Sequence, residues 1–301
     1  MNEDIKLSHR GKIIRDLVAL FNKNEMLRNK FSATGENPVP EKEYKYSDIY
    51  QVEYVDLENC KAEYIKPKES PSKWIIIQLH GGGYVGGLKN SYRNLAGLYS
   101  EMGQGAAVLS LDYRLAPDHV FPAALEDAFA GYEWAIARGY SEEEIILAGD
   151  SAGGGLAMGL CHYLKDNGKT RPRAIIAMSP WADLTGSGPS YKDNVVIDPV
   201  FGSRPEVVVG STYIGEDSAE NPYISPMFGD FAGFPKMLIQ VGTDEMLLSD
   251  SQTVRDKALT AGVEVDYTEY QGMFHVFQMA GKLMPESKQA WEQIKEFIDE
   301  L

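Results

Sequence analysis

The sequence is poor in cysteine, in basic residues and in long apolar runs, and each shortage excludes a class of protein. Cys60 and Cys161 are the two cysteines among 301 residues, and no motif spacing relates them. Two such thiols fit a reducing compartment better than a disulfide scaffold. The 29 Lys and Arg residues are outnumbered by 44 Asp and Glu, a net charge of −15 that argues against nucleic acid and anionic membranes as partners. The longest apolar runs are strand-sized, far short of a membrane span.

The N-terminal residues Met1–Lys6 have mixed charge and lack the apolar stretch of a secretory signal. With the sparse cysteines, this leads us to expect a cytoplasmic protein. The length and the 44% hydrophobic content allow one large α/β domain or two small ones with a sizeable buried core.

Apolar runs predict the strands of a mostly parallel sheet. They are continuous, as in strands covered on both faces, and helical stretches alternate with them. Two exposed strands at 51–57 and 61–66 should add an antiparallel edge, which makes about eight strands. The other runs lie at 74–79, 106–111, 145–148, 174–178, 237–241 and 263–270. The helices are expected at about 92–102, 122–138, 152–166, 249–261 and 287–300.

Two segments fall outside this alternation. Residues 12–31 carry apolar positions at helical spacing, and residues 183–235 are rich in Gly and Pro, with short helical pieces around Pro205–Tyr213. An insertion of this length between strands is typical of a lid or binding element. We therefore expect a cap formed by residues 1–45 and 183–235 over a catalytic domain at 46–301.

The most informative motif is Gly149-Asp150-Ser151-Ala152-Gly153, which lies between a predicted strand and a predicted helix. This context makes a G-x-S-x-G match a nucleophile elbow, in which a sharp turn exposes the serine hydroxyl. Glycines on both sides relieve the steric obstruction at such a turn. The following helix directs its N-terminal dipole at the site. Ser151 is therefore the candidate nucleophile.

A second motif, His80-Gly81-Gly82-Gly83, follows the buried strand that ends at Leu79. Consecutive glycines allow backbone N–H groups to point at one spot, as an oxyanion hole requires. The loop lacks the Lys-Ser/Thr ending and the helix-opening G-x-G-x-x-G of phosphate-binding loops. The N–H of Ala152, the residue after the nucleophile, should be a further donor.

The general base is found by elimination among five histidines. His275 follows the last predicted strand and comes after Ser151 in the chain, as the order Ser…Asp/Glu…His requires. The other four lie in the N-terminal segment, in the glycine loop, in a Pro-flanked turn, or too far along the helix after Ser151: His9, His80, His119 and His162.

The carboxylate that orients the base should follow a strand end between Ser151 and His275. Asp244 does so directly after the run at 237–241, and it is our prediction. Glu245 is adjacent but is expected to point elsewhere. Asp183, after the strand at 174–178, is the competing candidate.

Taken together, these motifs resemble the bacterial hormone-sensitive-lipase family of α/β-hydrolase esterases, from about residue 74 to the C-terminus. The resemblance rests on His80–Gly83, Asp112–Pro117, Gly149–Gly153 and Gly272–His275 in this order. It implies an eight-stranded α/β-hydrolase fold with a mobile cap, and carboxylester hydrolysis without a cofactor or metal. It also implies a triad of Ser151, Asp244 and His275, oxyanion donors on Gly81, Gly82 and Ala152, and a structural role for Arg114.

The resemblance favours short acyl chains, with an acetylated sugar or a lactone as alternative substrates. An amidase or peptidase, or a non-catalytic binding protein, is a less favoured function. A small-molecule ester is the expected partner, and a homodimer is plausible from the family. Aromatic and apolar loop residues could line the substrate pocket: Tyr84, Val85, Trp181, Phe201, Tyr213 and Phe274.

Overall fold

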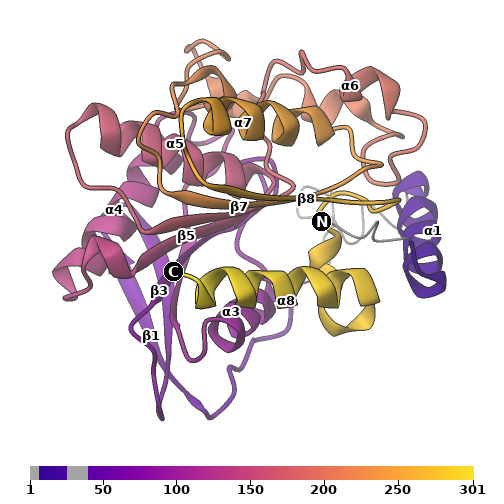
Figure 1. Cartoon of the computed structure of the whole chain (residues 1–301). Coiled ribbons are helices and arrows are strands. Elements are labelled where there is room, and N and C mark those ends of the chain that lie inside the picture. The colour runs from indigo at the N-terminus through magenta and orange to yellow at the C-terminus, as the bar shows by residue number, and fades with distance from the viewer. Residues whose placement is uncertain (1–6, 26–39) are drawn as a thin grey trace.

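Each run expected to form a strand does so, and the strands form one eight-stranded sheet in the order β1-β2-β4-β3-β5-β6-β7-β8 (Figure 1). The computed structural model describes residues 7–25 and 40–301. The strands are β1 (Tyr50–Leu57), β2 (Cys60–Pro67), β3 (Ile75–Leu79), β4 (Ala107–Asp112), β5 (Ile145–Asp150), β6 (Ala174–Met178), β7 (Lys236–Gly242) and β8 (Val265–Tyr270).

The sheet is parallel except at one edge. β1 pairs antiparallel with β2, and β2 pairs antiparallel with β4, while every later pairing is parallel. The central strands β3, β5 and β6 are buried at every position, whereas the edge strand β1 is mostly exposed or half-buried. The continuous apolar runs therefore correspond to strands covered on both faces.

Helices cover both faces of the sheet (Figure 1). α3 (Asn90–Met102) and α8 (Pro285–Asp299) pack on one face, where Trp291 and Phe297 join the smaller core. The larger core lies on the other face, beneath α4 (Ala123–Ala137), α5 (Ala152–Asp166) and α7 (Leu248–Thr260). The predicted α/β-hydrolase fold is confirmed.

The segment at 183–235 leaves the sheet after β6 and returns at β7. It contains short elements, including those expected near Pro205: α6 (Ser190–Asp193), η2 (Pro205–Val208), η3 (Thr212–Ile214) and η4 (Pro226–Phe228). A further 3-10 segment, η5 (Phe277–Leu283), follows the loop of His275. The cap and its boundaries at 1–45 and 183–235 remain a prediction.

The N-terminal helix α1 (His9–Lys23) begins three residues earlier than expected, because the Ser8 side chain caps it by accepting from Gly11 N. Ile14 and Val18 pack against a third apolar cluster that includes Phe274. The expected extension to residue 31 lies outside the described residues beyond position 25. α1 lies beside the edge of the sheet at which the strand β8 ends (Figure 1).

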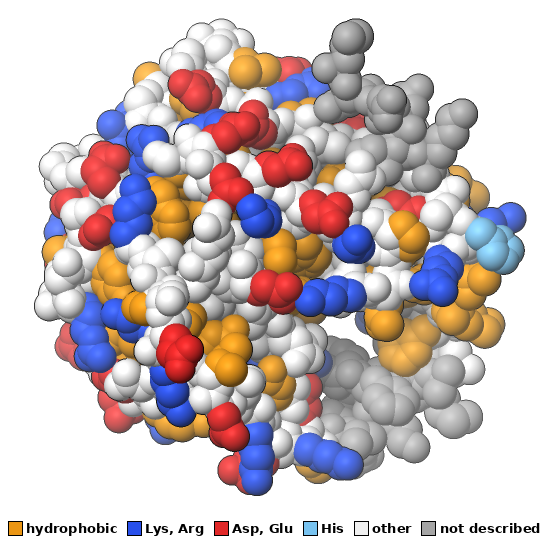
Figure 2. Space-filling model, turned by 60° about the horizontal axis from the view of Figure 1, so that its bottom comes forward, with side chains coloured by type: hydrophobic (Ala, Val, Ile, Leu, Met, Phe, Trp, Pro, Cys, Tyr) orange, Lys and Arg blue, Asp and Glu red, His pale blue; other side chains and the backbone are white. Residues whose placement is uncertain are grey.

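Acidic and basic side chains are interspersed on the face shown in Figure 2, without an extended patch of one sign. Both cysteines are unpaired and buried. Within residues 7–25 and 40–301, no helix combines the length and the apolar content needed to cross a bilayer.

Candidate active site

Ser151 lies at a strained turn between β5 and α5. Its φ of 52° and ψ of −123° lie in a region that residues other than glycine rarely adopt. A Cβ on Gly149 would lie 2.4 Å from the Gly153 carbonyl carbon, and one on Gly153 would lie 1.9 Å from the Leu79 oxygen. The two glycines are therefore required by close backbone approach, and the elbow predicted from the sequence is present.

A chain of three side chains runs from Ser151 through His275 to a carboxylate. His275 Nε2 lies 2.9 Å from Ser151 Oγ, and His275 Nδ1 lies 2.9 Å from Glu245 Oε2. With Nδ1 protonated, the imidazole donates to the carboxylate and accepts from the hydroxyl at Nε2. Ser151 and His275 are 7% and 9% exposed, and Glu245 is fully buried. The geometry is that of a serine nucleophile, its base and an orienting acid.

The carboxylate in this chain is Glu245, so the prediction of Asp244 is wrong. The backbone turns immediately after β7 ends at Gly242, and the Asp244 carboxylate points to α1, where Arg15 Nη2 donates to it at 2.6 Å. Glu245 is one residue further along the turn, and its Oε1 accepts from the backbone N–H of Gly242. Asp244 therefore faces α1, and the Glu245 carboxylate faces His275.

Asp183, the competing candidate, has a different function. Its Oδ1 accepts from Thr185 N, and its Oδ2 accepts from Ser187 N and Ser187 Oγ at 2.8 and 2.7 Å. These bonds close the turn that begins the segment after β6.

Ser179 belongs to the site, although no sequence motif singled it out. Its hydroxyl donates to Glu245 Oε1 at 2.7 Å and accepts from Val276 N at 3.1 Å. The residue is fully buried, and its φ is 48°. Ser179 therefore joins the acid loop to the loop of the base. Its position directly after β6, at the carboxyl edge of the sheet, is the signal that could have identified it.

The glycine loop offers backbone donors beside Ser151, but the prediction for Gly81 is wrong. The Gly81 N–H already donates to Asp150 Oδ1 at 3.2 Å. The N–H groups of Gly82 and Gly83 have no acceptor within the described residues, and both glycines have positive φ, 111° and 64°. Ala152 begins α5, so its N–H lacks an intrahelical acceptor. The available donors are therefore on Gly82, Gly83 and Ala152.

Two buried titratable residues support the glycine loop. Burial raises the pKa of Asp150 to about 6, although His275 and the Gly81 N–H oppose this shift. Burial lowers the pKa of His80 to about 4, so its ring is neutral near pH 7. His80 Nδ1 lies 2.7 Å from Gly81 O, and the ring stacks on Tyr113 at 4.1 Å. His80 therefore braces the loop.

The six residues expected to line the substrate pocket occupy different environments. Tyr84, Trp181 and Tyr213 are at most 2% exposed, and the rings of Tyr84 and Tyr213 stack at 3.8 Å. Phe274 is buried in the cluster that also receives α1. Phe201 lies against the base, with its ring centre 4.7 Å from that of His275, and Val85 is 37% exposed. Their roles in substrate binding remain predictions.

Arg114 has the anchoring role expected for it. Its guanidinium pairs with Asp127 and Glu126 at the start of α4 and donates to Ala123 O. His162 Nε2 lies 3.1 Å from Pro226 O, and the ring packs against Phe231 and Phe234, in agreement with its exclusion as the base.

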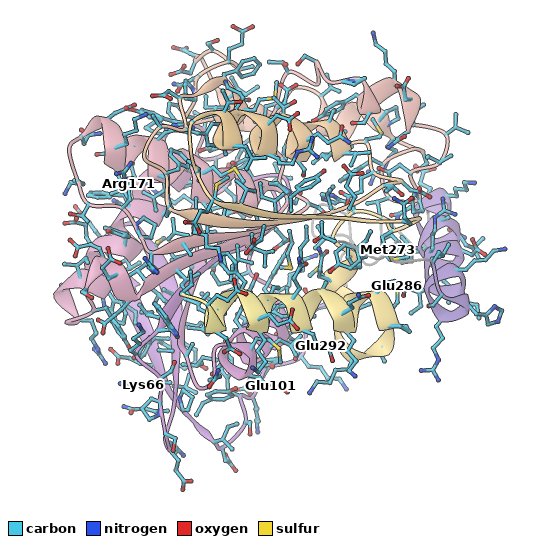
Figure 3. All side chains as sticks on the ribbon, in the orientation of Figure 1. Lys66, Glu101, Arg171, Met273, Glu286 and Glu292 are labelled. Atoms are coloured by element: carbon cyan, nitrogen blue, oxygen red, sulfur yellow. The ribbon has the colours of Figure 1, made fainter. Side chains whose placement is uncertain are left out.

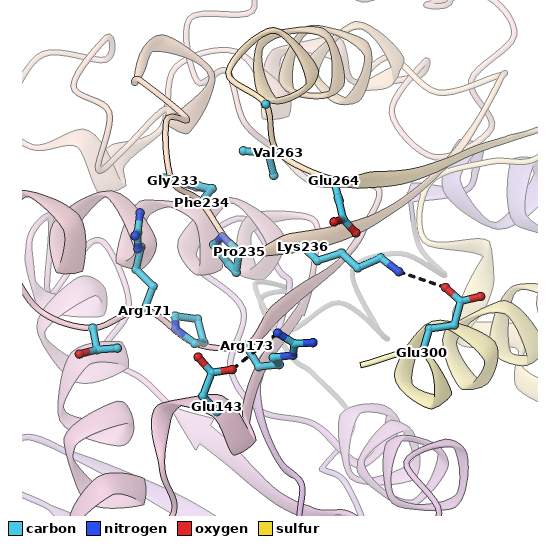
Figure 4. Close-up of a pocket in the computed structure, with 13 residues that line it drawn as sticks. Glu143, Arg171, Arg173, Gly233, Phe234, Pro235, Lys236, Val263, Glu264 and Glu300 are labelled. Atoms are coloured by element: carbon cyan, nitrogen blue, oxygen red, sulfur yellow. Dashed lines mark hydrogen bonds and ion pairs between the residues drawn. The ribbon is translucent and has the colours of Figure 1, made fainter.

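A hollow of about 420 Å³ lies at the opposite edge of the sheet, where the parallel strands begin (Figure 4). Its lining residues include no serine, cysteine or histidine. Two of its cations are already paired, Arg173 with Glu143 and Lys236 with Glu300. Because ligands of parallel sheets bind beyond the carboxyl ends of the strands, this hollow is not the candidate active site.

Known proteins are similar to this chain in sequence and in fold. Residues 76–279 match the family described as alpha/beta hydrolase fold. An acetyl-hydrolase of Streptomyces hygroscopicus is 36% identical over 244 residues, which are 81% of each chain. The crystal structure of EstE5 soaked with p-nitrophenyl butyrate has a TM-score of 0.83 at 34% identity, covering 97% of this chain and 98% of that one. An esterase from the bacterial hormone-sensitive lipase family has a TM-score of 0.84 at 31% identity, covering 100% and 99%.

Proposed function

The chain belongs to the bacterial hormone-sensitive-lipase family of α/β-hydrolases and is a carboxylic ester hydrolase, and we propose that it cleaves short-chain acyl esters through an acyl-enzyme on Ser151. The observation that carries this proposal is the pair of 2.9 Å contacts that link Ser151 Oγ, His275 and Glu245. A serine hydroxyl is a weak nucleophile unless a base takes its proton, and this arrangement supplies the base.

The first half-reaction forms the acyl-enzyme. Ser151 Oγ attacks the ester carbonyl carbon while its proton passes to His275 Nε2. Glu245 stabilises the imidazolium that results and keeps Nδ1 protonated. The tetrahedral intermediate collapses as His275 returns the proton to the departing alcohol oxygen. Water then attacks the acyl carbon in the same way and releases the acid and free Ser151.

The oxyanion that forms in each half-reaction requires preorganised donors. We assign them to the N–H groups of Gly82, Gly83 and Ala152, which have no acceptor within the described residues. The dipole at the N-terminus of α5 adds favourable potential at the same place.

The enclosure of the site supports a preference for small acyl groups. Ser151 is 7% exposed, and the Phe201 ring lies against His275. Similar proteins agree with this choice, since one is named as an acetyl-hydrolase and crystals of another were soaked with p-nitrophenyl butyrate. Acetylated sugars and lactones are the alternative substrates, since they require the same chemistry.

A series of p-nitrophenyl esters tests the proposal. With wild-type protein, kcat/KM should be highest for acetate or butyrate and should fall through octanoate to palmitate. Ser151→Ala should keep the thermal unfolding temperature within a few degrees and lose nearly all turnover. A p-nitroanilide of the same acyl group measures amidase activity and should be turned over far more slowly. Full activity of Ser151→Ala would overturn the mechanism. A maximum of kcat/KM at palmitate would overturn the chain-length preference.

A further inference from the structure

Helix α1 reaches the catalytic acid loop through one arginine. Arg15 Nη2 donates to Asp244 Oδ2 at 2.6 Å and to Ile197 O at 3.0 Å. The side chains of Arg15 and Asp244 are 23% and 19% exposed, so this ion pair is largely shielded from solvent. One guanidinium therefore joins α1, the loop after β7 and the segment after β6.

Asp244 is in turn connected to both partners of the nucleophile. It immediately precedes Glu245, and its N–H donates to the carbonyl oxygen of Met273, two residues before His275, at 3.1 Å. Thr243 Oγ1 donates to Asp244 Oδ1 at 3.1 Å and accepts from Gly272 N at 2.8 Å. Met273 lies on the side of the molecule on which α1 packs (Figure 3). A displacement of Asp244 would therefore move both the loop of Glu245 and the loop of His275.

The 194–203 loop, which Arg15 also contacts, holds the backbone on both sides of Glu245. Asn194 Nδ2 donates to the carbonyl oxygens of Thr243 and Glu245 at 3.0 and 2.7 Å. Asp198 Oδ2 accepts from Met246 N at 2.8 Å. The same loop carries Phe201, whose ring lies against His275. The segment that covers the base is thus bonded to the acid loop that orients the base.

We propose that Arg15 and Asp244 are positioning residues through which docked α1 holds Glu245 in its catalytic orientation. The proposal rests on the proposed function, because it takes Glu245 as the triad carboxylate. Docking of α1 then completes the alignment of acid and base, in addition to the covering role that the predicted cap gives it. A helix that served as a cover alone would limit access to Ser151 without affecting the chemical step.

These two roles predict opposite effects of breaking the ion pair. If α1 is a cover alone, Arg15→Gln opens the site, so kcat is unchanged or higher and any change is in KM. If Arg15 positions Glu245, kcat falls while KM changes little, because a small misalignment of reacting groups slows the chemical step. We expect a decrease in kcat of about tenfold for p-nitrophenyl acetate, well below the roughly hundredfold loss for a displacement of 1 Å.

The experiment compares Arg15→Gln, Asp244→Asn and the double variant. Because the two residues act through one another, the double variant should be no slower than the slower single variant, whereas independent effects would multiply. The rate of inactivation by diethyl p-nitrophenyl phosphate, which reports on the reactivity of Ser151, should fall in parallel with kcat. Arg15→Lys keeps the charge and can reach one of the two acceptors, so it should give an intermediate kcat.

Two controls separate positioning from general loosening. Asn22→Ala removes the bond from α1 to Pro199 O at 3.2 Å and leaves the Arg15–Asp244 pair intact. Arg138→Gln removes an ion pair with Glu53 that lies outside the site. Both should keep kcat within about twofold of wild type, with the thermal unfolding temperature measured for every variant.

The proposal is overturned if Arg15→Gln leaves kcat unchanged or raises it, if Asn22→Ala lowers kcat as much as Arg15→Gln, or if the single effects multiply. Should Arg15→Gln fail to fold, Arg15→Lys and Asp244→Asn decide between the same outcomes. Failure of the proposed function itself is recognised separately, because Ser151→Ala would then retain activity.

Discussion

Replacing Glu245 by Gln removes the charge at His275 Nδ1 with almost no change in volume. The carboxylate oxygen lies 2.9 Å from Nδ1 and both groups are buried, so the imidazolium formed during catalysis loses its principal counter-charge. Two unit charges 3–4 Å apart interact by about 4–6 kcal/mol at an effective dielectric constant of 20. At 1.36 kcal/mol per power of ten, kcat should fall by about three to four powers of ten. An amide at this position can also present its NH2 group to Nδ1 and so favour the wrong tautomer.

The assay is turnover of p-nitrophenyl butyrate by Glu245→Gln, with Asp244→Asn and Asp183→Asn as controls. We expect KM to change little for Glu245→Gln, because the carboxylate acts on the base and not on bound ester. Asp244→Asn should lose about tenfold, through alignment alone. The assignment is refuted if Asp244→Asn or Asp183→Asn is the slowest of the three, or if Glu245→Gln keeps more than about a tenth of wild-type kcat.

Three further predictions concern the surroundings of the triad. Burial raises the pKa of Asp150 from 3.8 to about 6, so ionisation of its carboxyl destabilises the fold increasingly between these pH values. Between pH 4 and pH 8, the free energy of unfolding of Asp150→Asn in urea should therefore rise by up to about 3 kcal/mol relative to that of wild type. A difference that stays constant with pH would contradict the shift. A Cβ on Gly153 would lie 1.9 Å from a backbone oxygen at the end of β3, so Gly153→Ala should lower the thermal unfolding temperature sharply or prevent folding. Gly97 lies in an open helical position, so the control Gly97→Ala should raise the free energy of unfolding by about 0.5–1 kcal/mol. Ser179→Ala leaves the buried carboxylate of Glu245 with one donor fewer, so kcat for p-nitrophenyl butyrate should fall about tenfold, and an unchanged kcat would exclude a positioning role.

The fold could be predicted from the sequence because its signals are long and redundant. Runs such as Ile75–Leu79 and Ala174–Met178 are apolar at nearly every position, and a strand covered on both faces has no polar side to obscure the pattern. The elbow is equally clear in the sequence, because its two glycines are imposed by close backbone approach: a Cβ on Gly149 would lie 2.4 Å from a backbone atom, and one on Gly153 would lie 1.9 Å from another.

The triad acid could not be fixed to a single residue in this way. Asp244 and Glu245 are adjacent carboxylates after the same strand, and the turn after Gly242 decides which of them faces His275. That choice depends on backbone angles and on tertiary partners, in particular Arg15, which lies 229 positions earlier and pairs with Asp244. A local pattern contains no information about such a partner.

One of the three predicted oxyanion donors, Gly81, is wrong for a similar reason. The sequence shows consecutive glycines but not which N–H groups are free. Gly81 donates to Asp150, 69 positions later, and a Cβ on Gly81 would lie 2.2 Å from that carboxylate. The first glycine is therefore needed for contact with the elbow, which leaves the N–H groups of Gly82 and Gly83 without an acceptor among the described residues.

Covalent trapping at Ser151 tests the central claim most directly. The protein is incubated with diethyl p-nitrophenyl phosphate, and the modified peptide is located by tandem mass spectrometry alongside the release of p-nitrophenol. We predict one equivalent of p-nitrophenol per chain, a single adduct on Ser151, and no adduct in Ser151→Ala. An adduct on another residue, or full ester turnover after Ser151 is blocked, would contradict the mechanism.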